Sequence, residues 1–354
     1  MIFFRFVFFL LLSYGLFYIA YRYFDPGLNM LDIFRYHRMA QHPLVFDRDI
    51  AGSPFIYRQF DAILTHLFYQ TGLFYNAPIE FTGEDINQRI YFASILSDYT
   101  ALILTALLVS EIFDMELGRV TLLPALFAGV LCFLSFGTMS FILTGLTEAW
   151  GWFFISLGYY ALKKENLVLF SIVLIISIFQ REIISIIFTV FSFLLFIFSK
   201  YRYKAYNFNF LKMSIISFAS FVMYVIYRKY LFPISGFSNQ LDKNSLLSNL
   251  LNFSLTPKLI VTTVIPENIF MIMLLVLAVA LIFMRDKIRD IFIVFKMDLL
   301  FSIVFTLIFL LMLGMATDIK YDIGRILHTI TPIIAVLTAY YLYILNQEFD
   351  KNQN

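Results

Sequence analysis

Two charged residues, Arg181 and Glu182, stand side by side in a strongly apolar part of the sequence. Residues 167–179 before them are apolar except for two serines, and residues 183–198 after them are mainly apolar. An arginine binds phosphate bidentately, and a carboxylate can act as a general base. Charges in such surroundings must face a water-filled or protein-lined cavity and find partners there. The pair therefore indicates a polar binding site inside an apolar protein.

The spacing of three charges along the chain predicts their common depth. Glu148 lies fifteen residues before Lys163 and Arg181 lies sixteen after Glu165, on either side of the tight "KKEN" connector. At about 1.5 Å per residue both helices rise only ~22–24 Å, against a hydrocarbon core of ~30 Å. We expect Glu148, Arg181 and Glu182 to line a cavity that opens on the outer side. The alternative is a plain helical hairpin at a locally thinned surface.

Two further segments are expected near this level. "DIKYDIGR" (318–325) brings Asp322 and Arg325 to the membrane rim, and Asp98 lies about two turns inside the second predicted span. Asp98 either lines the cavity or serves as the structural partner of a buried arginine.

The bulk composition gives the class of protein. Of 354 residues, 61% are hydrophobic and 14% are charged, whereas a soluble domain carries roughly a quarter charged residues. The chain is predicted to be an all-α, polytopic membrane protein. The single cysteine, Cys132, excludes disulfides within the chain, cysteine-based metal sites and c-type haem. No run of basic and aromatic residues suggests nucleic acid as a partner.

Ten helical spans are predicted, within one integral membrane domain over residues 1–354. The basic connectors 163–166, 199–212 and 285–296 are expected in the cytoplasm, which places both termini there. Residues 23–89 then form a structured extracytoplasmic loop. The first span is interpreted as a retained helix and not as a signal peptide, because it is as long as a membrane span and no cleavage site follows it. The predicted spans are 2–22, 90–113, 121–145, 149–162, 166–180, 183–198, 213–231, 266–284, 299–316 and 326–346.

The long loop is predicted to contain interfacial helices. Ser53 is the expected N-cap of one helix, with Pro54 at its first position. Arg58, Asp61 and Thr65 fall opposite its apolar stripe, which is typical of a helix lying in the membrane interface. Residues 29–42 are predicted to form a second, shorter one. The apolar stripe consists of Ile56, Phe60, Ile63, Leu64, Leu67 and Phe68.

Acidic and basic residues are frequent in this loop, and together they suit a lipid-linked phosphate substrate near the headgroups. Charges that only keep an interfacial loop soluble are the alternative. The acids are Asp25, Asp32, Asp47, Asp49, Asp61, Glu80, Glu84 and Asp85, and the arginines include Arg35, Arg38, Arg48 and Arg58.

Five short motifs, in this order, resemble the polytopic GT-C glycosyltransferases. The resemblance touches most of the chain, although each motif is short and degenerate. The motifs are D-x-x-x-Y-x-x-x-A (Asp32, Tyr36, Ala40), P-[FY]-x-Y-R (Pro54, Phe55, Tyr57, Arg58), T-E (Thr147, Glu148), [TQ]-R-E (Gln180, Arg181, Glu182) and G-R-x-L followed by proline (Gly324, Arg325, Leu327, Pro332).

The resemblance implies transfer of a sugar from a polyprenyl-phosphate donor to a lipid-linked or glycan acceptor on the extracytoplasmic face, with inversion. By position it implies that Asp32 is the base. Asp25, in the turn "YFDPG", and Asp47 and Asp49, which form a D-x-D motif, are the alternatives. The D-x-D motif also allows a divalent cation, but no metal is assigned.

The same resemblance assigns the remaining site residues. Arg58, Arg181 and Arg325 are expected to hold the donor phosphate, and Glu148 and Glu182 to orient arginines or sugar hydroxyls. His37 and His42 are expected to be solvated at headgroup level, and Trp150 and Trp152 are expected to pack and not to stack on a sugar.

Three other functions remain open from the sequence: a polymerase or ligase of lipid-linked glycans, a secondary transporter of a small polar solute, and a membrane scaffold. A transporter tends to show internal repeats and midplane charges, and neither is visible here. The lack of cysteine pairs and retention signals favours the bacterial inner or plasma membrane.

Overall fold

The described part of the protein is helical throughout and contains no strand, in agreement with the all-α prediction. The structure is a computed structural model. It describes residues 1–23, 32–52, 54–74, 87–134, 137–138, 142–233, 248, 268, 273–279, 296–316 and 323–353. The predicted site residue Asp25 lies outside these ranges, as do Asp322, Ser53 and most of the predicted span 266–284.

Helix bounds follow the apolar segments closely at most positions. In chain order the main elements are α1 (Ile2–Tyr23), α3 (Ile33–Gln41), α4 (Gln59–Gln70), α5 (Gln88–Leu117), α6 (Leu123–Val130), α7 (Glu148–Lys163), α8 (Leu167–Ser177), α9 (Ile183–Tyr203), α10 (Phe208–Ile226), α16 (Met297–Ala316), α17 (Ile323–His328) and α18 (Thr331–Gln353). Short 3-10 turns cover Phe55–Tyr57 and Leu131–Phe133, and a π-helical turn, Tyr227–Leu231, extends α10.

Five of the described helices are long and apolar enough to cross a membrane. They are α1, α5, α9, α10 with its π-helical turn, and α16. Such helices are compatible with an integral membrane protein.

Two of the ten predicted spans are broken in the structure. Instead of one helix over 121–145, α6 ends at Val130 and the chain bends at residues 143–146. Gly145 has φ +75°, and a Cβ there would lie 2.7 Å from Ser94 Oγ, so the bend requires glycine. The predicted span 326–346 is divided into α17 and α18 at Thr329–Ile330. Pro332 then occupies the first turn of α18, where its missing N–H costs no hydrogen bond.

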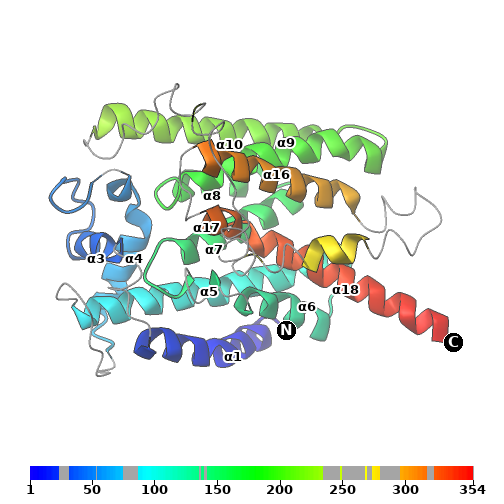
Figure 1. Cartoon of the computed structure of the whole chain (residues 1–354), viewed down its shortest axis with the longest axis horizontal. Helices are drawn as coiled ribbons and strands as arrows, with labels where there is room; N and C mark the ends of the chain where they lie inside the picture. The colour runs from blue at the N-terminus through cyan, green and yellow to red at the C-terminus, as the bar shows by residue number, and fades with distance from the viewer. Residues whose placement is uncertain are drawn as a thin grey trace.

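The central element is α5, which is 30 residues long and mostly buried. It packs against α1, α4, α6, α7 and α18, while α9 and α10 form an antiparallel pair beside α16. In Figure 1, α3 and α4 lie at the left-hand end, the N-terminus lies near the middle of the lower edge, and the C-terminus lies at the right-hand end.

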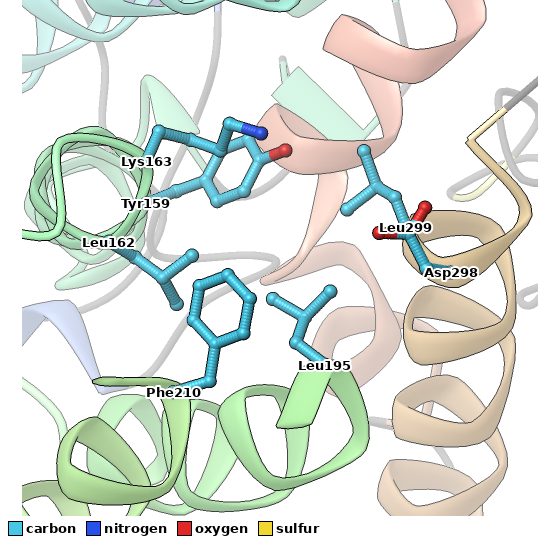
Figure 2. Close-up of a pocket in the computed structure, with 7 residues that line it drawn as sticks. All are labelled: Tyr159, Leu162, Lys163, Leu195, Phe210, Asp298 and Leu299. Carbon is cyan, nitrogen blue, oxygen red and sulfur yellow. The ribbon is translucent and has the colours of Figure 1, made fainter. Parts of the chain in front are cut away.

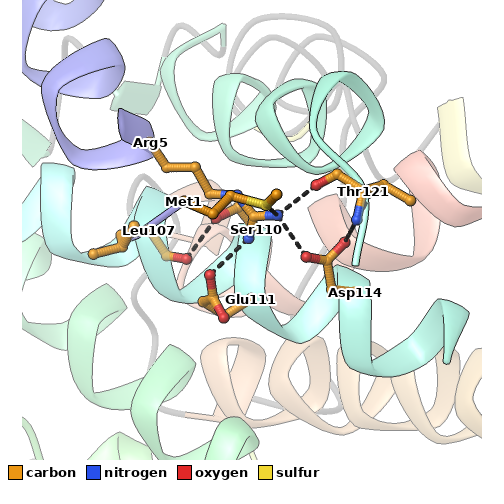
Figure 3. A network of polar contacts seen from close by, with 7 residues as sticks. All are labelled: Met1, Arg5, Leu107, Ser110, Glu111, Asp114 and Thr121. Carbon is orange, nitrogen blue, oxygen red and sulfur yellow. Dashed lines mark hydrogen bonds and ion pairs between the residues drawn. The ribbon is translucent and has the colours of Figure 1, made fainter. Parts of the chain in front are cut away.

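A buried arginine fixes α1 to the C-terminal end of α5 (Figure 3). Arg5 is 1% exposed and contacts Glu111 at 2.6 Å and Asp114 at 2.5 Å. It also donates to the carbonyl of Thr121, which follows α5. Arg5 is therefore paired on several sides, as a buried charge must be.

A second ionic contact joins α5, α7 and α16 at the same end. Glu116 accepts a hydrogen bond from Tyr159 at 2.7 Å and pairs with Lys163 at 2.8 Å and with Lys296. Beside it lies a cavity of about 20 Å³, with Tyr159, Lys163 and Asp298 among its lining residues (Figure 2). This cavity is at the opposite end of α7 from Glu148, so it is not the one predicted from the sequence.

Candidate functional site: a buried arginine–carboxylate cluster

The antiparallel helices α7 and α8 bring Glu148 and Arg181 to one level. Asn166 caps α8 by accepting a hydrogen bond from Leu169 N at 2.9 Å, and the turn before it is closed by Asn166 N to Ala161 O at 3.0 Å. Both helices are short, with 16 and 11 residues. The common level of Glu148 and Arg181 is confirmed, because Arg181 Nη1 lies 3.0 Å from Glu148 Oε1.

Glu148 is the shared anion of two arginines. The same Oε1 atom accepts a hydrogen bond from Arg325 Nε at 2.5 Å. Arg181 contacts it as a charge without hydrogen-bond geometry, since Arg181 Nη1 has no hydrogen-bond partner. Glu148 is 3% exposed and Arg181 is 7% exposed. Residues 177 positions apart in the sequence thus meet at the first turn of α7, where a carboxylate is favoured by the helix dipole.

The third arginine belongs to the first long loop. Arg58 precedes α4 and donates to Glu182 Oε1 at 3.3 Å and to the Tyr36 hydroxyl at 3.1 Å. Arg58 and Glu182 have side chains 13% and 24% exposed. The arginine–carboxylate cluster therefore comprises Arg58, Arg181, Arg325, Glu148 and Glu182, and all five are predicted substrate-binding residues.

Backbone and ring contacts hold α4 against the cluster. Phe60 N donates to Phe179 O at 3.0 Å, which ties the first turn of α4 to the turn carrying Arg181. The Phe60 ring also packs edge-on against Trp150 and Phe154 of α7. These contacts fix the neighbouring residue, Asp61, beside α7.

Two further carboxylic acids lie beside the cluster. Asp61 is 2% exposed and Asp98 is completely buried. Both are close enough to Glu148 to interact with its charge, and Asp98 also feels the charge of Asp61. Burial first, and the charge of Glu148 second, raise the pKa of Asp61 to about 8. Asp98 accepts a hydrogen bond from Gly145 N at 2.7 Å. Among the described residues it has no arginine partner, which one of its two predicted roles required.

Several polar atoms of this region are buried without a hydrogen-bond partner in the described structure. Such atoms are costly unless a ligand or water completes them. The donors are Arg58 Nε, Arg181 Nε and Arg181 Nη1, and the acceptors are Asp61 Oδ1, Asp98 Oδ1, Glu148 Oε2, Gln180 Oε1 and Glu182 Oε2. The donors suit an anion and the acceptors suit hydroxyl groups. The region could therefore bind a ligand that carries both an anionic group and hydroxyl groups.

The predicted catalytic acids have different surroundings. Asp32 precedes α3, its side chain is 35% exposed, and it pairs with Arg35 at 3.1 Å. Asp47 and Asp49 lie in an exposed turn in which Asp47 accepts a hydrogen bond from Asp49 N at 3.0 Å. No contact of Asp32, Asp47 or Asp49 with the cluster is recorded among the described residues. The described part also holds no group of three acid, histidine or cysteine side chains arranged for a metal ion.

The loop helices differ in detail from their prediction. Helix α3 lies within the predicted 29–42, but α4 begins at Gln59, after a 3-10 turn, and not at Pro54. Its polar face does not point to water: Asp61 and Thr65 are buried against protein, while Leu67 of the apolar stripe is 56% exposed.

The aromatic residues behave as expected, and one histidine does not. Trp150 donates to Ser97 Oγ and Trp152 to His328 O, each at 2.9 Å, and both rings are buried in packing. His42 is exposed, but His37 is buried beside Ser94, and burial lowers its pKa to about 3. His37 is therefore neutral and structural.

Sequence reasoning missed Asp61 as a neighbour of the cluster. It placed Asp61 and Thr65, which are four positions apart, on one helical face, but treated Asp61 as one loop charge among many. That spacing places both side chains on one face, but only the folded structure shows that this face is buried.

Neither protein-family models, nor curated proteins, nor solved structures gave any match to this chain.

Proposed function

We propose that the protein is a membrane glycosyltransferase that moves a sugar from a polyprenyl-phosphate donor to a lipid-linked or glycan acceptor. The observation that carries the proposal is the convergence of Arg58, Arg181 and Arg325 on Glu148 and Glu182, with guanidinium atoms of Arg58 and Arg181 left without partners. A phosphate is the anion that this donor geometry suits.

The chemistry required of the site is modest. In-line attack of the acceptor oxygen on the anomeric carbon forms one bond while the bond to the phosphate oxygen breaks, so the configuration inverts. Negative charge grows on the leaving phosphate, and preorganised guanidinium groups in a dry site stabilise it. Glu148 and Glu182 hold the arginines in place, and their remaining oxygens, Glu148 Oε2 and Glu182 Oε2, accept from sugar hydroxyls.

We place the site towards the extracytoplasmic face of a bacterial plasma membrane, with both termini cytoplasmic. Lys163 and Lys296 lie at the opposite end of the molecule from Glu148, beside the C-terminal end of α5. Basic residues gather on the cytoplasmic side, so this distribution supports an outward-facing site.

The test is transfer from a radiolabelled polyprenyl-phosphate sugar to acceptor lipids by the purified protein in nanodiscs. We expect transfer by the wild type and a loss of roughly 100-fold or more in Arg181→Ala, the effect of removing one preorganised donor. Arg325 remains to pair with Glu148 in that variant, so folding is preserved. Arg119→Ala, an exposed arginine after α5, is the matched control and should keep full activity.

A wild type that transfers no sugar from any polyprenyl-phosphate donor, but exchanges a polar solute across proteoliposomes, would instead identify a secondary transporter. Joining of two preassembled lipid-linked glycans would identify the polymerase or ligase.

A further inference from the structure

The acid best placed to do proton chemistry at the arginine–carboxylate cluster is not one of the exposed acids of the first loop. Asp61 lies in the first turn of α4, directly after Phe60, whose backbone is hydrogen-bonded to Phe179. Arg181 and Glu182 follow Phe179 by two and three residues. A backbone hydrogen bond therefore holds the residue next to Asp61 against the turn that carries Arg181, and the Asp61 carboxyl lies close enough to Glu148 to interact with its charge.

The Asp61 carboxyl group is also buried with one oxygen that has no hydrogen-bond partner. Only 2% of Asp61 is exposed, and its Oδ1 atom has no hydrogen-bond partner. No arginine or lysine forms an ion pair with Asp61 in the described structure. Asp32, by contrast, is one-third exposed and bound to Arg35. A carboxylate bound to a cation is a weak base, because the cation stabilises its charged form. An unpaired, desolvated carboxylate is a stronger one.

The region around Asp61 contains unpartnered hydrogen-bond donors as well as acids. Glu148, whose charge acts on Asp61, is paired with Arg181, which is 7% exposed with Nε and Nη1 unpartnered. Gln180 follows Phe179, the residue bound to the Phe60 backbone, and is fully buried with Oε1 unpartnered. Unpartnered donors and acceptors together suit a ligand, or water, that both accepts and donates hydrogen bonds. A sugar phosphate is such a ligand.

We infer that Asp61 is the general base of the proposed transfer, taking the proton from the acceptor hydroxyl. This inference rests on the proposed function. The acceptor O–H bond breaks and its proton goes to a carboxylate oxygen of Asp61. The acceptor oxygen bonds to the anomeric carbon, and the polyprenyl phosphate leaves with the electron pair of the bond it gives up. The bonds formed and broken in this step balance without a metal ion or a redox partner.

The charges around Asp61 give the pH dependence. Asp98 faces it from α5 and Glu148 from α7, with Arg181 and Arg325 bound to Glu148. On the α3 side, His37 is neutral and bound to Ser94, and Arg58, just before α4, is bound to Tyr36 and Glu182. The pKa of Asp61 is raised to about 8 by burial and by Glu148. Only the ionised form accepts a proton, so kcat should rise with pH up to about 8 and then level off.

The test compares Asp61→Asn with Asp32→Asn in the transfer assay. Asn resembles the protonated form of Asp61 that predominates at pH 7, so the variant should fold and bind donor normally. We expect kcat to fall roughly 100-fold or more, the usual contribution of a general base, with the donor KM unchanged. The residual activity should lose the rise near pH 8, and Asp61→Glu should restore part of kcat. Asp32→Asn should keep both the rate and the pH profile.

An Asp61→Asn variant with wild-type kcat, or a pH rise that disappears in Asp32→Asn and persists in Asp61→Asn, overturns the inference while leaving the proposed function standing. A wild type without transfer activity overturns the proposed function itself.

Discussion

At the scale of single residues, the molecule is organised around Glu148. One oxygen of this carboxylate meets both Arg325 and Arg181, residues that come from distant parts of the chain. Neither arginine could remain charged at this depth without an anion, because an isolated buried charge is costly. Glu148 is thus both the structural partner of two cations and the residue that aims them at a shared position.

Replacing Glu148 should therefore affect stability as well as activity. Glu148→Gln leaves two guanidinium groups without their anion, and we expect a loss of about 3–5 kcal/mol in the free energy of unfolding, as found when one partner of a buried pair is removed. Thermal unfolding in detergent measures it. Glu165→Gln, an exposed residue in the α7–α8 turn that contacts only Asn207 and Asn209 among the described partners, is the control and should unfold near the wild-type temperature. Equal unfolding temperatures for the two variants would contradict the paired role of Glu148.

At the scale of elements, a ring of α9 packs directly against α7, the helix that begins with Glu148. Gly158 lies in the middle of α7, and a Cβ at that position would meet the buried ring of Phe188 on α9 at 2.6 Å. Nearer the cluster, a Cβ on Gly151 would only touch the Arg181 side chain at 3.5 Å. Glycine at 158 leaves room for the Phe188 ring, so that α9, which follows Arg181, packs against the helix that carries Glu148.

Gly158→Ala should separate these helices. We expect a destabilisation of about 1–3 kcal/mol, typical of overpacking in a closed interface, together with reduced transfer activity. Gly15→Ala is the matched control, since Gly15 lies in an exposed part of α1 with nothing within 4 Å of an added Cβ. In the control the helix should gain roughly 0.5–1 kcal/mol from the better helix former. The measurement is the unfolding temperature of both variants. A Gly158→Ala variant that unfolds at the wild-type temperature would contradict the role given to Gly158.

The elements also show where sequence reasoning succeeds and where it stops. Residue counts on either side of the Lys163–Asn166 turn predicted that Glu148 and Arg181 lie at one level, because helical rise is fixed by geometry; their contact is seen only in the structure. The break after Val130 was not predictable from apolarity alone. The later bend at residues 143–146 includes Gly145, whose N–H donates to Asp98, and this contact exists only in the folded molecule. The burial of Asp61 is likewise tertiary, since its helix carries a polar face that suits water and protein equally.

At the scale of the whole molecule, polar contacts are divided between two ends. Arg5 with Glu111 and Asp114, and Glu116 with Lys163 and Lys296, join helices at one end. There the recorded acids are largely matched by cations. At the other end, the arginine–carboxylate cluster and the neighbouring Asp61 and Asp98 keep unpartnered atoms. The ion pairs at one end join the helices, although Arg5 Nε is also unpartnered there, and the larger group of unpartnered atoms at the other end supports the proposed ligand site.

The most direct test of this account is whether the protein recognises the phosphate of a polyprenyl lipid through Arg181. Native mass spectrometry of the wild type with polyprenyl monophosphate, and separately with the matching polyprenol, measures this without requiring the sugar or acceptor. The account predicts that the phosphorylated lipid binds, that the alcohol binds at least tenfold more weakly, corresponding to about 1.4 kcal/mol, and that Arg181→Ala removes the difference. Equal binding of both lipids to the wild type, or an unchanged preference in Arg181→Ala, would contradict it.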